Sequence, residues 1–370
     1  MSLTQDELKR YSRHLILPEV AKEGQEKLKA SRVLVVGAGG LGCPLLMYLA
    51  AAGVGHLGII DFDVVDESNL QRQVIYGTSD VGKSKVEVAK ARLLELNPTI
   101  QVTTYQEPLT SDNALALFEQ YDIVADGTDN FATRYLVNDA CVLTGKPNVY
   151  GSIFRFEGQV TVFNYQNGPN YRCLYKEPPP PGLVPSCAEG GVLGVLPGVI
   201  ATLQATEVLK IILGIGNVAS GKLLTYDALR LSFRELMVKK RYDYEIKGLI
   251  DYEEFCGVKK VSEKEVKEIT VHELKQKLDV NEAFDLIDVR EEHEYDICNL
   301  EGSTLIPLGT LEDTLPSLDK DKAYVVHCKL GGRSAKAVDL MQNKGFKNVL
   351  NLAGGINEWA TEIDLDMPVY

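Results

Sequence analysis

Two stretches of the chain combine residue types and spacings that could do chemistry. The first is residues 32–42, R-V-L-V-V-G-A-G-G-L-G, where Gly37, Gly39 and Gly42 fit the pattern G-x-G-x-x-G and Gly40 adds a fourth glycine. Glycines let the backbone turn sharply and approach a phosphate, and a helix that begins there directs free N–H groups at the anion. This stretch predicts a nucleotide site.

The second stretch is residues 327–334, H-C-K-L-G-G-R-S, in which four residues separate Cys328 from Arg333. A thiol in such a loop would be surrounded by backbone N–H groups close to the start of a helix, an arrangement that stabilises a sulfur anion. A buried structural cysteine is the other interpretation. The neighbouring Gly331 and Gly332 fit it poorly, so we expect a reactive sulfur here.

The glycine stretch has the surroundings of a nucleotide-binding unit. An apolar strand is expected at 33–36, a helix at 43–52 and a second strand at 56–61, which ends in Asp61, nineteen residues after Gly42. An acid at that place meets a ribose hydroxyl. An NAD enzyme and an ATP enzyme share all of these features, so they leave the nucleotide open.

Charged residues farther along the chain favour ATP. Arg72 follows in a long polar loop, Lys85 lies near the start of an amphipathic helix expected at 81–96, and Asp129 follows the apolar strand expected at 123–125. Acids at the carboxyl ends of parallel strands lie where open α/β sheets bind their ligands. Hydride transfer to or from NAD would give these three residues no task, and it is the weaker interpretation.

The whole pattern predicts an α/β protein in two parts. We expect a doubly wound, Rossmann-like nucleotide-binding domain at 1–245, a charged linker at 246–264 and a smaller α/β domain at 265–370. In the smaller part, strands are expected at 284–288, 323–327 and 348–351, with a helix at 334–343 and a capping box at 270–273. Five prolines in residues 176–187 predict an extended loop that ends at Cys187.

Composition limits the class of protein. The formal net charge of −13 argues against a surface that binds nucleic acid strongly. Seven cysteines without a C-x2-C pair favour reduced thiols, the N-terminus has no apolar signal segment, and no run of 18 apolar residues exists. We therefore expect a cytoplasmic protein without a membrane span.

Several motifs in the first part resemble the MoeB/ThiF family of adenylating enzymes, which are related to ubiquitin activators. The resemblance covers roughly residues 5–258. It is carried by R10-Y-S-R13, G37-A-G-G-L-G42, D61-F-D, S68-N-L-Q-R72-Q, G82-K-S-K85, D126-G-T-D129-N, G151-S-I-F-R-F-E-G-Q and Y226-D-A-L. It implies that ATP adenylates the C-terminal glycine of a small ubiquitin-like sulfur carrier ending in Gly-Gly.

The resemblance implies roles for individual residues. Arg72 and Lys85 would offset the charge that develops on the phosphates, and Arg13 would do so from the other subunit of a homodimer. Asp129 would hold Mg²⁺ and Asp61 the ribose. The implied nucleotide-binding residues are Gly37, Gly39, Gly40, Gly42, Asp61, Ser68, Asn69, Leu70, Gln71, Arg72, Lys85, Asp129 and Asn130.

The second part, roughly residues 265–365, resembles rhodanese sulfurtransferases, which carry a persulfide on the loop cysteine. D288-V-R290, L300-E-G-S-T-L-I-P307 and L352-A-G-G-I-N-E-W359 carry this resemblance beside the Cys328–Arg333 loop. It implies that a Cys328 persulfide attacks the acyl-adenylate and that a second thiol releases the thiocarboxylate. Cys187 is the candidate for that thiol, or else for an acyl-thioester.

Some alternatives stay open at this point. The rhodanese-like part could be a non-catalytic docking module in a protein that only adenylates. The sulfur donor is expected to be a cysteine desulfurase or thiosulfate. Carriers of the molybdopterin, thiamine, cysteine and tRNA-thiolation pathways all remain candidates. We expect no zinc, because Asn170 stands where many family members have the first zinc-binding cysteine, and residues 242–248 contain no cysteine.

Overall fold

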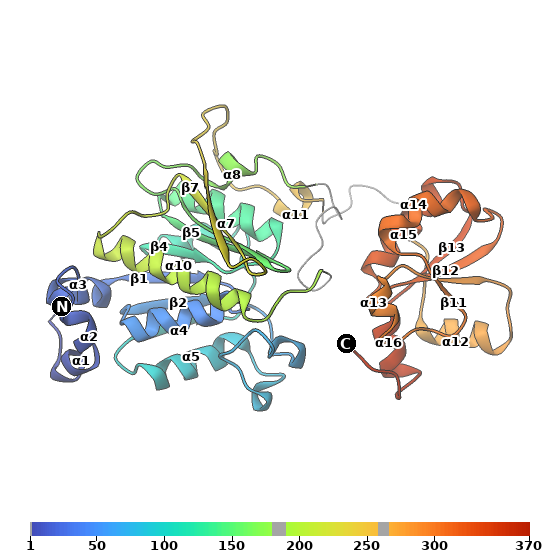
Figure 1. Cartoon of the computed structure of the whole chain (residues 1–370), viewed down its shortest axis with the longest axis horizontal. Helices are drawn as coiled ribbons and strands as arrows, with labels where there is room; N and C mark the ends of the chain where they lie inside the picture. Colours follow the sequence, from blue (N-terminus) through green and yellow to red (C-terminus); the bar gives the residue numbers. More distant parts are fainter. Residues whose placement is uncertain (1, 180–189, 258–265) are drawn as a thin grey trace. The chain divides into compact units, whose positions relative to one another are not determined.

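The structure is a computed structural model that describes residues 2–179, 190–257 and 266–370. The chain divides into two compact units, Met1–Val261 and Ser262–Tyr370. Each unit is built on its own β-sheet with helices on both faces (Figure 1). The loop residue Cys187 lies outside the described residues.

The sheet of the first unit has eight strands in the order β3-β2-β1-β4-β5-β6-β7-β8. The pairs from β3 to β5 are parallel, and the remaining pairs are antiparallel. The strands are β1 (Arg32–Val36), β2 (His56–Ile60), β3 (Gln101–Tyr105), β4 (Ile123–Asp126), β5 (Asn148–Phe154), β6 (Glu157–Phe163), β7 (Lys222–Asp227) and β8 (Ser232–Met237). The order reverses between β1 and β4, which is where doubly wound sheets bind ligands.

Two hydrophobic cores cover the two faces of this sheet. Val33 and Val35 of β1 belong to one core, and Leu34 and Val36 belong to the other, because successive side chains of a strand point to opposite faces. Among the described residues of the first unit, the helices are α1 (Gln5–Arg10), α2 (Ser12–Leu15), α3 (Ala21–Ala30), α4 (Gly42–Ala52), α5 (Lys85–Leu96), α6 (Ala114–Phe118), α7 (Phe131–Thr144), α8 (Tyr171–Leu174), α10 (Leu196–Leu213) and α11 (Tyr252–Phe255). Short 3-10 turns lie at Glu67–Asn69 and Thr78–Asp80.

Helix α10 is long and apolar enough to cross a membrane by length and composition alone, with 18 residues and a mean hydropathy of 1.5. In the structure it packs beside α4 and across β5 and β6 (Figure 1). Ile200, Ala201 and Val208 are fully or almost fully buried there. The side chain of Gln204 also faces inward and donates to the backbone carbonyls of Asp126 and Val149. These contacts are those of a core helix.

Two expectations differ from the structure in this unit. The helix expected at 81–96 begins only at Lys85, because Val64 and Ser84 form an antiparallel bridge that holds residues 81–84 extended or in turns. Part of the expected linker, 246–264, belongs to the first unit. Helix α11 lies within it, and its residue Tyr252 and the following Cys256 are buried in the core around α7.

The second unit has a parallel five-stranded sheet in the order β11-β10-β12-β13-β9. Its strands are β9 (Glu268–Ile269), β10 (Asp285–Asp288), β11 (Ser303–Leu305), β12 (Ala323–His327) and β13 (Asn348–Leu352). Its helices are α12 (Val271–Asp279), α13 (Glu292–Tyr295), α14 (Leu308–Thr314), α15 (Gly332–Asn343) and α16 (Gly355–Glu362), with a 3-10 turn at Leu315–Ser317. Thr270 and Glu273 form the expected capping box.

Candidate functional site

The glycine turn joins β1 to α4 and cannot be built from other residues. Gly37 has φ +91°, which L-residues rarely adopt, and a Cβ on Gly42 would lie 2.0 Å from the carbonyl oxygen of Gly37. The turn is tied to the neighbouring strand, because Gly37 N–H donates to the carbonyl of Ile60 over 2.9 Å. The backbone is therefore free of side chains where the helix begins.

Asp61 follows β2 directly, and its carboxylate joins the glycine turn to the start of the loop after β2. Its Oδ2 accepts the N–H of Ala38 in the glycine turn, and its Oδ1 accepts the N–H of Asp63, both over 2.8 Å. The carboxylate lies beside the glycine turn, at the place where a nucleotide's ribose is expected. The acid follows the second strand directly, as the sequence predicted, and its contact with a ribose stays a prediction.

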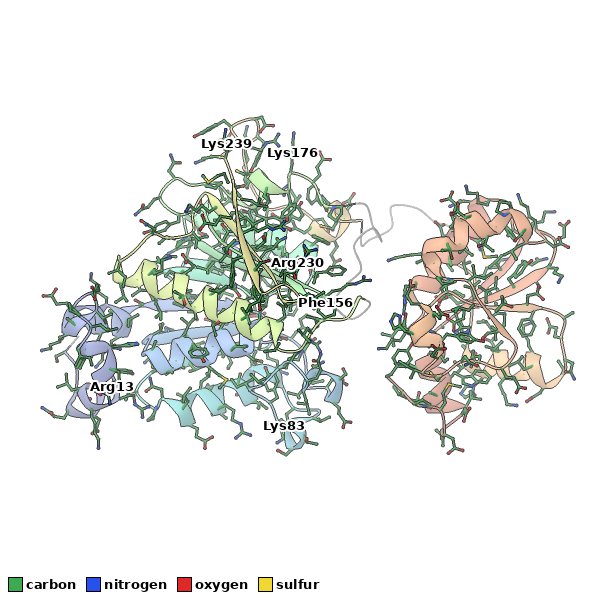
Figure 2. All side chains as sticks on the ribbon, viewed as in Figure 1. Arg13, Lys83, Phe156, Lys176, Arg230 and Lys239 are labelled. Carbon is green, nitrogen blue, oxygen red and sulfur yellow. The ribbon has the colours of Figure 1, made fainter. Side chains whose placement is uncertain are left out.

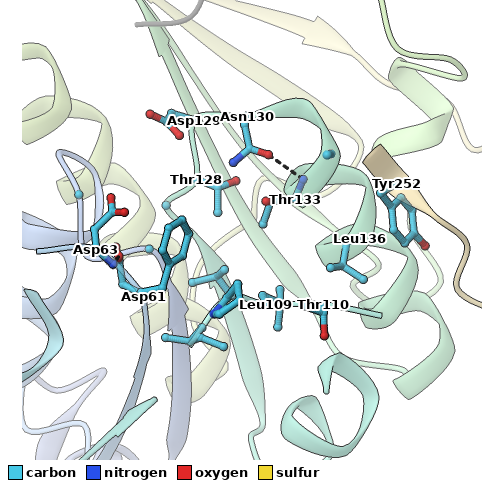
Figure 3. A pocket seen from close by; sticks show the side chains of 18 of the residues that line it. Asp61, Asp63, Leu109, Thr110, Thr128, Asp129, Asn130, Thr133, Leu136 and Tyr252 are labelled. Carbon is cyan, nitrogen blue, oxygen red and sulfur yellow. Dashed lines mark hydrogen bonds between the residues drawn. The ribbon is translucent and has the colours of Figure 1, made fainter. Parts of the chain in front are cut away.

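A cavity of about 950 Å³ opens at the carboxyl ends of the parallel strands (Figure 3). Eight of the residues implied by the family resemblance line it: Gly37, Gly39, Gly40, Asp61, Arg72, Lys85, Asp129 and Asn130. A Cβ on Gly40 would lie 3.3 Å from Pro197 and 3.5 Å from Arg72 Cγ, so the glycine keeps this wall open. Bare backbone beside two cations fits a polyphosphate.

Lys85 is the first residue of α5, and its side chain lines the cavity. The residue is 5% exposed, and its Nζ lies 2.8 Å from Asp63 Oδ2. The backbone brings the pair together, since Lys85 N–H donates to the carbonyl of Asp63 beside the Val64–Ser84 bridge. A nearly buried ammonium at the cavity wall is suited to bind a phosphate oxygen.

Arg72 extends into the cavity from the polar loop, while the residues just before it serve that loop. Arg72 Nη1 donates to the carbonyl of Ser68 over 3.1 Å. Leu70 packs against the hydrophobic core. Gly42, Ser68, Asn69, Leu70 and Gln71 were expected to bind nucleotide, yet they do not line the cavity.

The segment after β4 forms the opposite wall. Thr128 donates its N–H and its hydroxyl to Asp126 Oδ1, over 2.9 and 2.6 Å, and burial raises the pKa of Asp126. Asn130 caps α7 by accepting the N–H of Thr133 (Figure 3). The turn holds the exposed Asp129 at the cavity. No group of three or more His, Cys, Asp or Glu residues suited to a metal occurs in the described part of the chain.

Sequence reasoning missed several lining residues. Phe62, Asp63 and Gln73 flank residues that it did identify, and Gln73 is 4% exposed with its Oε1 unpartnered among the described residues. Residues 107–112 and 249–253 form a further wall. Phe62, Asp63 and Gln73 lie within the motifs D61-F-D and S68-N-L-Q-R72-Q, which were a signal in the sequence for these three residues.

Arg13 does not line the cavity. It lies on the short helix α2, is exposed, and is labelled in Figure 2. Arg13 was expected to act on the site of the other subunit of a homodimer, and the structure of one chain leaves that role a prediction.

In the second unit, Cys328 lies directly after β12, in the turn that leads into α15. The residue is 1% exposed, and its Sγ accepts the N–H of Gly331 over 3.2 Å. The hydroxyl of Ser334 lies 3.3 Å from Cys328 Sγ and 3.0 Å from the carbonyl oxygen of Gly331, so its single hydrogen is shared between these two acceptors. Gly331 has φ +90°, which turns its N–H toward the sulfur. The expected loop around a sulfur is present, and Ser334 adds a donor that sequence reasoning did not assign.

Arg333 is directed at a carboxylate. Its Nη1 and Nη2 donate to Glu294 Oε2 and Oε1, each over 2.6 Å. Burial acts to raise the pKa of Glu294, but hydrogen bonds from Arg333 and the Glu291 backbone outweigh it and lower that pKa to about 2. Tyr370 Oη also donates to Glu294 Oε1 and accepts from Arg290. The loop arginine is held by an ion pair that fixes the loop.

His327 precedes the loop cysteine and is fully buried. Neither ring nitrogen has a hydrogen-bond partner among the described residues, and Nε2 lies 3.8 Å from Asp288 Oδ2. Burial lowers the pKa of His327 to about 4, although the Asp288 charge opposes that shift. Asp288 is itself bound by Arg290 over 2.6 Å, so its charge is already compensated.

Cys173 lies at the position where the family resemblance implies a zinc-binding cysteine in many members. Polar groups of the protein surround its sulfur. Its Sγ accepts the N–H of Asn170 and that of Arg241, each over 3.4 Å, and lies 3.6 Å from Tyr244 Oη. Tyr244 also donates to Asn170 Oδ1. A hydrogen-bonded cluster thus joins the two segments. That no zinc binds stays a prediction.

Comparison with known proteins gives matches over both units. Residues 11–246 match the ThiF family, and residues 270–362 match the rhodanese-like domain. The whole chain is 50% identical to the probable adenylyltransferase/sulfurtransferase MoeZ of Mycobacterium tuberculosis, of which it covers 97%. It is 45% identical to the adenylyltransferase and sulfurtransferase MOCS3 of Mus musculus, of which it covers 88%.

Two further matches concern the first unit. Over 70% of its length the chain is 54% identical to the sulfur carrier protein adenylyltransferase of Thermus thermophilus, all of which it covers. The crystal structure of E. coli MccB with ATP superposes with a TM-score of 0.56 at 24% identity, covering 65% of this chain and 73% of that one. This structural likeness concerns the fold alone.

Proposed function

The chain belongs to the ThiF family and carries a rhodanese-like domain, and we propose that it adenylates the C-terminal glycine of a ubiquitin-like sulfur carrier and converts it to a thiocarboxylate. The protein is an adenylyltransferase and sulfurtransferase, as its full-length relatives are named. The observation that most directly supports ATP as a substrate is the cavity, in which the glycine turn, Lys85 and Arg72 lie beside Asp61.

In the first half-reaction, the carrier carboxylate attacks the α-phosphorus of ATP, the bond to the bridging oxygen breaks, and pyrophosphate leaves with its electron pair. Lys85 and Arg72 stabilise the negative charge that develops on the phosphate oxygens. Asp61 holds the ribose, and the N–H groups of the glycine turn face the phosphates. Mg²⁺, held by Asp129, would neutralise part of the pyrophosphate charge.

In the second half-reaction, the outer sulfur of a Cys328 persulfide attacks the acyl carbon, and AMP leaves. This gives an acyl disulfide. The thiolate of a second cysteine, which we assign to Cys187, then attacks Cys328 Sγ, forms a disulfide with it and releases the carrier thiocarboxylate. Before Cys328 takes up sulfur from the donor, the N–H of Gly331 and the hydroxyl of Ser334 stabilise the negative charge of its thiolate.

Other parts of the proposal rest on the family resemblance. We assign Arg13 to the phosphates of the partner chain in a homodimer, because in its own chain it lies outside the cavity. The sulfur donor is thiosulfate or the persulfide of a cysteine desulfurase. We place the protein in the cytoplasm.

The test is a full-length reaction with Mg-ATP, thiosulfate and carriers that end in Gly-Gly, read by intact-mass spectrometry. A carrier that exchanges one oxygen for one sulfur supports both half-reactions and identifies the carrier. In the Cys328→Ser variant, ATP–pyrophosphate exchange should persist while the thiocarboxylate disappears. Full thiocarboxylate yield from that variant would instead show that the rhodanese-like domain only docks a partner.

A further inference from the structure

The nucleotide cavity has two unlike halves. The glycine turn, Lys85 and Arg72 form a cationic half around the expected phosphates. The other half includes apolar side chains from three separate segments: Pro108, Leu109, Leu136, Leu249, Ile250 and Tyr252. In Figure 3, Leu136 and Tyr252 lie on the opposite side of the view from Asp61 and Asp63. A ligand that fills both halves carries phosphates at one end and a flat apolar group at the other.

The segment Leu249–Glu253 is held firmly in this wall. Ser111 Oγ donates to the carbonyl of Ile250 over 2.8 Å, which ties the segment to the loop after β3. Tyr252 is 5% exposed, and its hydroxyl donates to Asp139 Oδ2 over 2.8 Å, which ties it to α7. The backbone carbonyl of Ile250 and the side chain of Tyr252 are thus each hydrogen-bonded to a different element, so both neighbours of Asp251 are held in place.

The residues that follow strengthen this attachment. The ring of Phe255 packs edge to face on Tyr135, with centroids 5.2 Å apart, and the guanidinium of Arg172 lies 4.8 Å from the Phe255 ring. Cys256 is 8% exposed within the same core. The wall is therefore part of the packed unit and was not recognisable as such from its charged, irregular sequence.

We propose that Leu249–Glu253 is the wall that receives the adenine ring of ATP, so that this segment helps to select the base. The inference rests on the proposed function, since it assumes that ATP fills the cavity. In a doubly wound sheet the base lies beyond the ribose, away from the glycine turn, and Asp61 marks the ribose here. The apolar faces of the ring contact Leu109, Leu136 and Leu249. The hydroxyls of Thr110 and Thr133 also line the cavity and can form hydrogen bonds with the polar edge of the ring.

The carrier tail is the competing occupant of this half. Its terminal carboxylate must reach the α-phosphorus, which lies at the glycine turn and not at the far wall. The geometry therefore favours the base.

The experiment compares the binding of two probes by full-length Leu249→Ala. Mg-ATP uses both halves of the cavity, whereas inorganic tripolyphosphate uses only the phosphate half. Leu249→Ala should weaken ATP about tenfold, because apolar surface that contacts the ring is lost, and should leave tripolyphosphate affinity unchanged. The ratio of ATP to GTP affinity should fall as well. Ser111→Ala, which releases the tether, should act in the same direction.

Leu229→Ala is the matched control, since Leu229 is 73% exposed and does not line the cavity. Equal losses for ATP and tripolyphosphate in Leu249→Ala would overturn the inference, because they would indicate general distortion. A raised KM for the carrier with unchanged ATP affinity would overturn it in favour of the carrier tail. If the wild-type protein bound neither probe, the proposed function would fail first, and the base wall with it.

Discussion

Lys85 Nζ and Asp63 Oδ2 form an ion pair 2.8 Å long at the wall of the nucleotide cavity, between a nearly buried ammonium and a half-exposed carboxylate. The backbone holds both residues side by side. The N–H of Lys85 donates to the carbonyl of Asp63, and Val64 and Ser84 form an antiparallel bridge next to them. Asp63 therefore compensates the charge of Lys85 and orients its ammonium at the cavity wall. Under the proposed function, a phosphate of the nucleotide would take the place of Asp63 as the partner of Lys85.

Asp63→Asn should make the stability of the protein depend more strongly on nucleotide. The buried Lys85 charge would lose its partner, at a cost of about 1 kcal/mol in the nucleotide-free protein, and phosphates would restore a partner. We expect a lower Tm without ligand and a larger upward shift with Mg-ATP than in the wild type. Glu95→Gln, which alters an exposed ion pair on the same helix, is the control. An equal Tm loss with and without Mg-ATP would contradict the prediction.

Lys85→Ala should lower kcat/KM for ATP–pyrophosphate exchange by about 100- to 1000-fold, the usual cost of removing one group that stabilises transition-state charge. Lys83→Ala provides a matched control two residues away. The Lys83 side chain is 58% exposed and pairs with Asp80 outside the cavity. Its removal should change the rate by less than about twofold. Similar losses in both variants would show that Lys85 acts through general electrostatics.

Mixing two inactive variants tests the role of Arg13. If Arg13 serves the partner chain, a dimer of one Arg13→Ala chain and one Lys85→Ala chain has one site that lacks both groups and one that is intact. An equal mixture, after subunit exchange, should recover about a quarter of wild-type exchange activity. Failure to recover activity in dimers shown to be mixed would place Arg13 in its own chain's reaction or outside it.

Ser334→Ala should slow sulfur transfer from thiosulfate about tenfold, because the sulfur of Cys328 loses a hydroxyl donor 3.3 Å away. The rate of ATP–pyrophosphate exchange should not change, since the residue lies in the other unit. Ser317→Ala is the control, because the Ser317 hydroxyl bonds only a local carbonyl, that of Thr314. A transfer rate equal to that of the wild type would leave the Gly331 N–H as the relevant donor.

The second unit should lose stability as the pH falls from about 6.5 to about 4. Burial lowers the folded-state pKa of His327 to about 4, below its ordinary 6.5, so the unfolded chain takes up the proton first. The loss due to His327 approaches about 1.4 kcal/mol per pH unit within that window, and this contribution ends below it. His327→Leu should flatten this dependence, and His293→Asn should not.

Trp359 provides the measurement. It is the only tryptophan of the chain and is 7% exposed in the core of the second unit, so its fluorescence reports the unfolding of that unit by urea. Urea midpoints at pH 7.5, 6 and 5 would be compared for the three proteins. The prediction fails if His327→Leu retains the wild-type slope.

The sequence predicted what depends on local order and missed what depends on distant packing. The glycine turn, Asp61 and the Cys328 loop each follow one strand directly, so their placement follows from the strand alone. Lys85 was identified, but its helix was started four residues too early, because the Val64–Ser84 bridge is a contact between segments. Contacts with distant residues, among them Ser111 and Asp139, hold Leu249–Glu253 at the cavity, and no local sequence pattern records such contacts.

The low exposure of Cys328 determines which sulfur of a persulfide on this residue is accessible. A persulfide places its outer sulfur about 2 Å beyond Sγ. Gly331 and Ser334 cover one side of the inner sulfur, so an incoming electrophile meets the terminal sulfur first. Release of the thiocarboxylate requires in addition that the second thiol reach Cys328 Sγ from another side. Oxidants or alkylating agents too large to enter the loop would discriminate the loaded form from the empty one.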